Sequence, residues 1–135
     1  MTVQAPHRYA AGDELPQLAR CVTQAVINKY AEASGDHNPL HTDEEFAAGR
    51  QFGGTIAHGM LVLAYLSEML TGAFGERWAS GGRMKARFRA PARPGDRITV
   101  GGRVTRVNNG ILRCEAECRN EAGEVLASAE VQVPA

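Results

Sequence analysis

The chain lacks an excess of charge of either sign, because fifteen lysines and arginines are balanced by fifteen aspartates and glutamates. Without net charge there is no global field to attract nucleic acid or an anionic membrane. Cysteine is scarce, with three residues, and the segment Met1–Ala11 has no apolar stretch of the kind that a secretion signal needs. We therefore expect a protein of the reducing cytoplasm, without nucleic acid or membrane as a partner.

Long apolar runs are also few. The longest is Ile56–Leu70, in which eleven of fifteen residues are apolar. It is too short and too interrupted to cross a bilayer, which takes about 20 residues. A helix that is apolar on nearly all sides belongs in the middle of a domain. We expect Ile56–Leu70 to form such a buried helix, ended by Gly72 and Gly75.

The overall composition is that of an ordinary folded domain, with 44% apolar and 22% charged residues. Domains usually contain about 100–200 residues, so 135 residues suffice for one domain and are too few for two. We expect a single domain over residues 1–135.

Two shorter helices are predicted before the apolar run. Thr23 can cap a helix that reaches Ala33, because the apolar residues between them fall on one face. Thr42 and Glu45 have the spacing of a capping box, which predicts a short helix through Ala48. The stretch between these two helices is expected to be a loop.

After Gly82 the apolar period changes from that of a helix to that of strands with one solvated face. Asn109 and Gly110 form the preferred dipeptide of a two-residue hairpin turn. Cys114 and Cys118 fall on the apolar face and are interpreted as small core hydrophobes. The expected strands cover residues 18–23, 83–90, 98–104, 112–118 and 125–133. The fold class is therefore α+β, an antiparallel sheet wrapped around a long central helix.

The basic residues are unevenly distributed. Eleven of the fifteen lie between Arg77 and Arg119, against only three acidic residues. The simpler interpretation is the solvated face of a sheet, which long basic side chains usually cover. The alternative is a patch for a phosphate-bearing ligand or an acidic carrier protein. Its candidate contacts are Arg83, Lys85, Arg87, Arg89 and Arg93.

The loop Ser34–His41 concentrates residues that can do chemistry. It contains a carboxylate, an amide, a proline and two imidazoles within six positions. The Asn38–Pro39 dipeptide favours a turn, which would bring Asp36 and His41 together. Histidine exchanges protons near neutral pH, so the two could form a proton-handling pair. Alternatively, Asp36 merely caps the turn and His41 merely precedes the next helix.

Gly59 lies near the start of the apolar run, where backbone amides are free and no side chain blocks approach. Such amides can stabilise a developing oxyanion. Alternatively, Gly59 only allows close packing. The preceding His58 is interpreted as a hydrogen-bonded structural histidine rather than a catalyst.

These residues resemble a known family. The segments Tyr30–Phe46 and Ile56–Leu61 closely match the MaoC-like, (R)-specific enoyl-CoA hydratases, and Arg87–Arg97 extends the match over nearly the whole chain. The Gly-Asp-x-Asn-Pro-x-His core is highly specific. The resemblance implies a hot-dog fold, in which a sheet wraps a central helix.

The resemblance also implies roles for individual residues. Asp36 and His41 would be the catalytic pair, Asn38 a supporting hydrogen-bonding residue, and Gly59 the amide donor to the thioester oxygen. Ser67 would lie near the pair. No metal or other cofactor is implied. The family resemblance also implies a homodimer with the thioester at the subunit boundary.

We therefore expect a lyase that adds water to trans-2-enoyl thioesters or removes it from (R)-3-hydroxyacyl thioesters. The alternatives are a hot-dog acyl thioesterase and a non-catalytic dimeric module that binds acyl carriers. The sequence leaves open the acyl chain length, the choice between CoA and acyl carrier protein, and which of Asp36 and His41 is the base in each step.

Overall fold

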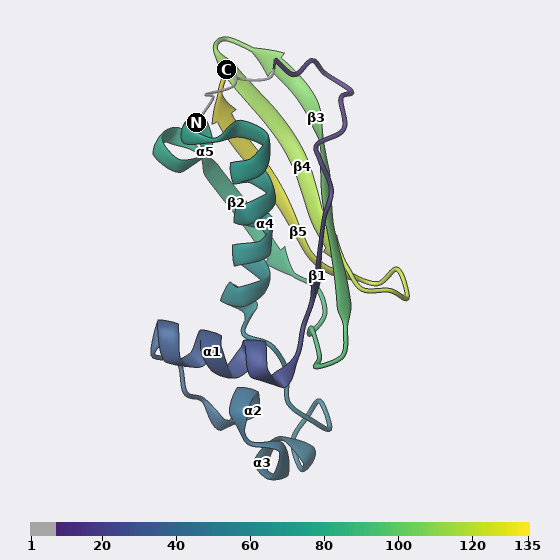
Figure 1. Ribbon diagram of the computed structural model, residues 1–135. Coiled ribbons are helices and arrows are strands. Elements are labelled where there is room, and N and C mark those ends of the chain that lie inside the picture. The colour runs from purple at the N-terminus through teal and green to yellow at the C-terminus, as the bar shows by residue number, and fades with distance from the viewer. Residues whose placement is uncertain (1–7) are drawn as a thin grey trace.

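The computed structural model describes residues 8–135, so most of the segment considered as a secretion signal lies outside the described residues. A long helix packs along an antiparallel sheet, and three shorter helices gather beyond its first turn (Figure 1). The elements in chain order are β1 (Leu18–Cys21), α1 (Gln24–Ser34), α2 (Pro39–Thr42), α3 (Glu44–Ala48), α4 (Gly59–Phe74), α5 (Glu76–Gly81), β2 (Arg83–Phe88), β3 (Arg97–Asn108), β4 (Ile111–Arg119) and β5 (Val125–Pro134).

The sheet has the strand order β1-β3-β4-β5-β2, and every neighbouring pair is antiparallel. The edge strands are β1 and β2. The predicted hairpin between β3 and β4 is confirmed, with Asn109 at φ 52° and Gly110 at φ 74°. Both residues need positive φ in the turn type whose twist matches that of paired strands.

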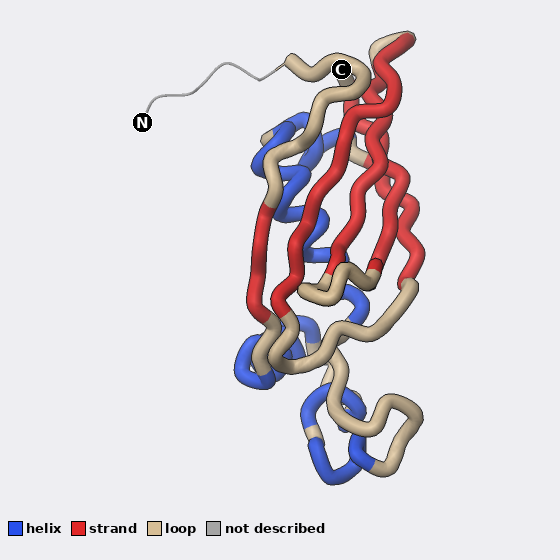
Figure 2. Tube along the Cα trace, turned by 90° about the vertical axis from the view of Figure 1, so that its right-hand side faces the viewer, coloured by secondary structure: helices blue, strands red, loops and turns tan. Residues whose placement is uncertain are grey.

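The helix α4 lies against one face of this sheet (Figure 2). Its inward side chains and those of the strands form one hydrophobic core. Leu66 and Leu70 of α4 are fully buried, as are Ile98 and Val100 of β3. The expected α+β fold, an antiparallel sheet around a central helix, is confirmed.

The boundaries of the central helix differ from the expectation. It begins at Gly59 rather than Ile56, because Ile56 and Ala57 are buried in an extended segment in which the Ala57 N–H pairs with the Ala92 carbonyl. Gly72 does not end the helix, since one helical glycine costs only about 1 kcal/mol. The helix ends at Gly75, which has φ 57°.

The short helices also differ from the expectation in their bounds and capping residues. The proposed Thr42 capping box is wrong, because Asp43 caps α3 by accepting a hydrogen bond from the Phe46 N–H at 3.1 Å. Thr42 instead ends α2, which forms inside the expected loop with Pro39 in its first turn. The helix from Thr23 is confirmed as α1, capped by the Thr23 hydroxyl. The sequence does not predict α5.

The two strand cysteines are confirmed as core residues. Cys114 and Cys118 are 2% and 0% exposed. Burial raises the pKa of the Cys114 thiol to about 11 and that of Cys118 to about 12, so both stay protonated at neutral pH. Over residues 8–135, the structure contains no helix long and apolar enough to span a membrane.

Candidate active site

The loop after α1 is folded by bonds between its own side chains and backbone. Gly35 ends α1 with φ 78° and donates its N–H to the Ala31 carbonyl. The Asp36 N–H then donates to the Ser34 hydroxyl at 3.2 Å, and the Asn38 N–H donates to the Asp36 carboxylate at 3.2 Å. These contacts turn the chain back, so that the two ends of the expected loop come close together.

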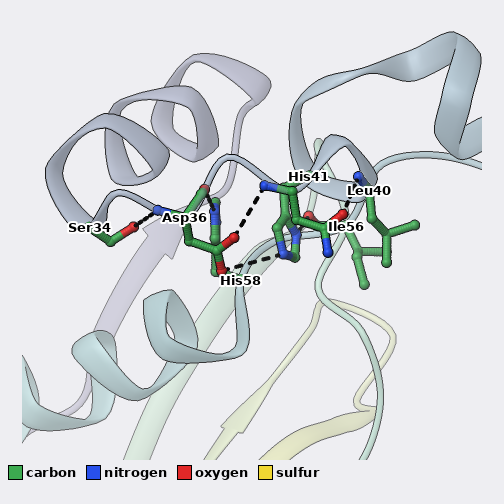
Figure 3. Close-up of polar contacts among 7 residues, drawn as sticks. Ser34, Asp36, Leu40, His41, Ile56 and His58 are labelled. Atoms are coloured by element: carbon green, nitrogen blue, oxygen red, sulfur yellow. Dashed lines mark hydrogen bonds and ion pairs between the residues drawn. The ribbon is translucent and has the colours of Figure 1, made fainter.

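Asp36 and His41 meet as expected. His41 Nε2 lies 4.0 Å from Asp36 Oδ2, and the His41 ring is 12% exposed against 53% for the carboxylate (Figure 3). On its other edge, His41 Nδ1 donates to the Ile56 carbonyl at 2.8 Å. A carbonyl can only accept, so Nδ1 carries the proton, and the lone pair of Nε2 in neutral His41 faces Asp36. A 4.0 Å separation exceeds a direct hydrogen bond but lets one water molecule bond to both groups.

His58 completes the cluster from the start of α4. It is 2% exposed, and its Nε2 donates to the Asp36 backbone carbonyl at 3.0 Å. Its ring stacks on His41, with 3.9 Å between ring centroids and 26° between planes. The Tyr30 ring lies 4.9 Å away at 60°.

The first turn of α4 presents free backbone donors beside this cluster. Gly59 begins the helix, and no side chain caps it. The first helical amide donors have no partner within the helix, and the helix dipole favours negative charge there. The Phe88 ring packs against Gly59 so closely that an added Cβ would lie 2.8 Å from the ring. An alanine at position 59 would therefore displace the Phe88 ring.

Asn38 has a local structural role. Its side-chain oxygen accepts the Leu40 N–H at 3.0 Å and caps α2. It is the Asn38 backbone, rather than its amide group, that contacts the Asp36 carboxylate.

Ser67 and Arg89 lie apart from the pair. Ser67 is eight residues beyond Gly59, about 12 Å along the helix, and its hydroxyl accepts the Trp78 Nε1–H at 2.9 Å. Arg89 donates to the Ser128 hydroxyl at 3.1 Å and lines a groove of about 600 Å³ on the outer face of the sheet. The structure therefore gathers Asp36, His41 and His58 but neither of these two.

The same groove holds much of the basic segment. Lys85 and Arg87 line it next to Arg89, but four glutamates line it too. Arg103 pairs with Glu115 at 3.7 Å, and exposed pairs of this kind are typical of a solvated sheet face.

Two contacts of the site escaped the sequence reasoning. The Ile56 carbonyl orients His41, but backbone groups carry no sequence signal. Phe88 lies on the apolar face of its strand, which indicates that it is directed toward α4, but nothing local indicates that it meets Gly59.

The cluster also offers metal-ligand types, since Asp36, His41 and His58 place potential ligand atoms within 4.8 Å of one another. The geometry does not suit an ion. Each imidazole donates one N–H to a backbone carbonyl and keeps its other nitrogen available, as a metal-bound histidine also would. The rings stack with 3.9 Å between centroids and 26° between planes, however, so an ion within bonding distance could not lie near the plane of both rings. The arrangement favours proton transfer over metal binding.

A sheet around a buried helix, here with a carboxylate–imidazole pair near the start of that helix, is the architecture of a hot-dog domain. A family model described as "MaoC like domain" matches residues 9–125. The chain belongs to this MaoC-like dehydratase family.

The names of similar proteins agree with this family assignment. The chain is 39% identical over 94 residues to 3-hydroxyacyl-thioester dehydratase Z of Mycobacterium tuberculosis, covering 66% of this chain and 62% of that protein. It is 32% identical to a 3-hydroxybutyryl-CoA dehydratase of Methylorubrum extorquens, covering 87% of this chain and 76% of the relative. The unliganded R-hydratase PhaJ1 of Pseudomonas aeruginosa superimposes with a TM-score of 0.81 at 27% identity, over 93% of this chain and 81% of that one.

Proposed function

We propose that the protein interconverts trans-2-enoyl thioesters and (R)-3-hydroxyacyl thioesters by adding or removing water. One observation carries the proposal: the 4.0 Å approach of His41 Nε2 to Asp36 Oδ2, beside the uncapped start of α4. The names of the dehydratase and hydratase relatives support it.

In the hydration direction, a water molecule bonds to both Asp36 and His41. His41 Nε2 takes a proton from this water as its oxygen bonds to the β-carbon of the enoyl group. The electron pair of the double bond moves toward the thioester carbonyl, and the Gly59 N–H stabilises the resulting enolate oxygen. The pair then returns a proton to the α-carbon on the same side, so the enzyme regains its starting state. Asp36 orients the water and can relay this second proton.

The surroundings of the pair support an acyl thioester as the substrate. A hollow of about 370 Å³ borders the loop Ser34–His41 and is lined by three apolar residues, Leu40, Phe46 and Phe52, and three polar ones, Asn38, Arg50 and Gln51. The apolar side chains could contact an acyl chain while the polar ones contact its thioester end. The carrier of the thioester is CoA or an acyl carrier protein.

We infer a homodimer in the cytoplasm. Met60 and Phe88 are 59% and 56% exposed. Met60 follows Gly59 in the sequence, and the Phe88 ring packs against Gly59. Large apolar side chains gathered beside a site favour coverage by a second copy. The edge position of β2 supports the same arrangement. Size-exclusion chromatography with light scattering at micromolar concentration tests this inference, and a monomer would contradict it.

A single assay tests the activity. Purified protein is incubated with crotonyl-CoA, and both the enoyl absorbance and free thiol are followed. The proposal predicts loss of absorbance without thiol release, and (R)-3-hydroxybutyryl-CoA as the product. Thiol release would indicate a thioesterase instead. If neither signal changes with crotonyl-CoA or with longer enoyl thioesters, the domain is a binding module.

A further inference from the structure

His58 is buried more deeply than either member of the acid–base pair. It is 2% exposed, and it lies at the N-cap of α4, in contact with the rings of Tyr30 and His41. Its two contacts with the pair come from different parts of the ring. The Nε2–H holds the Asp36 backbone, and one ring face covers the His41 imidazole.

The same ring leaves one polar atom unsatisfied. Within the described residues, His58 Nδ1 is buried and has no hydrogen-bond partner. His58 also does not cap α4 with its side chain, although it occupies the capping position. An unpaired buried nitrogen destabilises a fold, and such atoms call for an explanation other than stability. A phenylalanine would fill the same space without this cost.

We propose that His58 is the positioning residue of the acid–base pair, which fixes the separation between Asp36 and His41. The proposal rests on the proposed function and deepens it, since it assigns the geometry of the pair to a residue that takes no proton. His58 holds one member by its backbone carbonyl and the other by its ring face.

The way in which Asp36 is held makes such a tether necessary. Its side chain is 53% exposed, and its other contacts come from the same short loop: the Asn38 N–H on the carboxylate and the Ser34 hydroxyl on the backbone N–H. Those local bonds shape the loop but do not fix its distance from α4. The His58 bond joins residues 22 positions apart, and so connects the loop to the rigid helix.

His41 needs a second restraint for a different reason. Its bond to the Ile56 carbonyl fixes one edge of the ring but still allows the ring to rotate about that bond. Stacking on His58 at 3.9 Å limits this rotation and directs Nε2 toward Asp36. Ala57 lies between Ile56 and His58 in the sequence, and its N–H donates to the Ala92 carbonyl at 2.8 Å. The segment that restrains His41 and Asp36 is therefore itself fixed.

Two variants separate the hydrogen bond from the ring. His58→Gln keeps an N–H that can reach the Asp36 carbonyl but loses the ring face. His58→Phe keeps the ring but loses the donor. Trp78→Phe is the control, because it removes a partly buried hydrogen bond to α4 about two helical turns beyond Gly59. All three are compared by melting temperature, kcat and KM for crotonyl-CoA hydration.

We expect His58→Phe to lower kcat about tenfold or more with KM within about threefold of the wild type, because positioning acts on the transition state. His58→Gln, which keeps the donor but loses the stacked ring, should also lower kcat, and the control should keep its kcat. Folded His58→Phe with wild-type kcat would overturn the proposal. Wild-type kcat in folded His58→Gln would also overturn it, since the ring face would then not matter.

A substrate-free measurement keeps this test distinct from that of the proposed function. In ¹⁵N-resolved spectra, His41 of the wild type should show a protonated Nδ1 and an unprotonated Nε2, with the Nδ1 proton protected from exchange. His58→Gln, which loses the stacked ring, should broaden or lose that proton signal, whereas His58→Phe should keep it. If the wild type did not hydrate any enoyl thioester, the proposed function would fail while this signal still decided the role of His58. An unchanged signal in His58→Gln would overturn the positioning role.

Discussion

The contact between Gly59 and Phe88 predicts that a single methyl group will reduce activity without unfolding the protein. In Gly59→Ala, the new Cβ would lie 2.8, 3.0 and 3.2 Å from three atoms of the Phe88 ring. At least the shortest of these distances cannot persist, so the ring must move. It can do so because it is the end of a flexible side chain that is 56% exposed.

The effect on stability should be small because two terms oppose each other. Overpacking usually costs about 1–3 kcal/mol, at the low end where the neighbour can move. Replacing a helical glycine by alanine regains about 0.5–1 kcal/mol. We therefore expect the free energy of unfolding, measured by urea denaturation, to fall by no more than about 1–2 kcal/mol.

The effect on catalysis should be larger. In the proposed mechanism the thioester oxygen approaches the Gly59 N–H, and the methyl group and the displaced ring would lie beside this donor. Loss of one oxyanion donor typically costs about 10²–10³ in kcat. We expect at least a tenfold loss in Gly59→Ala, and partial recovery in Gly59→Ala combined with Phe88→Leu. Wild-type kcat in Gly59→Ala, or no recovery in the double variant, would refute this reasoning.

Three further predictions concern the pair, the basic face and the buried thiols. Asp36→Asn and His41→Gln should each lower kcat by about two orders of magnitude or more with the fold intact by circular dichroism, and the double variant should be little worse; near-normal hydration in either single variant would contradict the mechanism. Lys85→Glu should raise KM more than it lowers kcat, and added salt should weaken substrate binding to the wild type, if the outer face meets an anionic carrier; unchanged kinetics would support a merely solvated face. Because burial raises the thiol pKa of Cys114 and Cys118 from 9.0 to about 11 and 12, unfolded thiols ionise first as the pH rises. Their contribution to stability is thus complete below pH 9 and is lost toward pH 12, and denaturation midpoints that stay constant over that range would exclude it.

Local patterns predicted most of the fold because they report which faces are buried. The apolar run located the central helix, and the alternation after Gly82 located the strands. The helix start was misplaced because Ile56 and Ala57 are just as apolar as the helix, yet a tertiary bond to Ala92 holds them extended. The capping residue was misassigned because Asp43, next to Thr42, offers the same chemistry one position later.

The residues of the candidate site also differ in how far the sequence predicts their positions. Asp36 and His41 could be predicted together because a turn joins them within six residues. Ser67 was suggested only by resemblance, and in this chain its hydroxyl is bonded to Trp78. Arg89 follows Phe88 in the same strand region, where successive side chains point to opposite faces. Since Phe88 meets Gly59, Arg89 had to face outward.

The Asn109–Gly110 turn is a convenient place to label this domain. The turn joins β3 and β4 at the end of the sheet opposite to α2 (Figure 1). Its hairpin geometry depends on two residues with positive φ, and the Ala135 N–H also donates to the Gly110 carbonyl at 2.9 Å. A label attached at the Asn109 side chain would keep the backbone of the turn and would lie away from Asp36 and His41, so the domain could be immobilised or labelled with that end free.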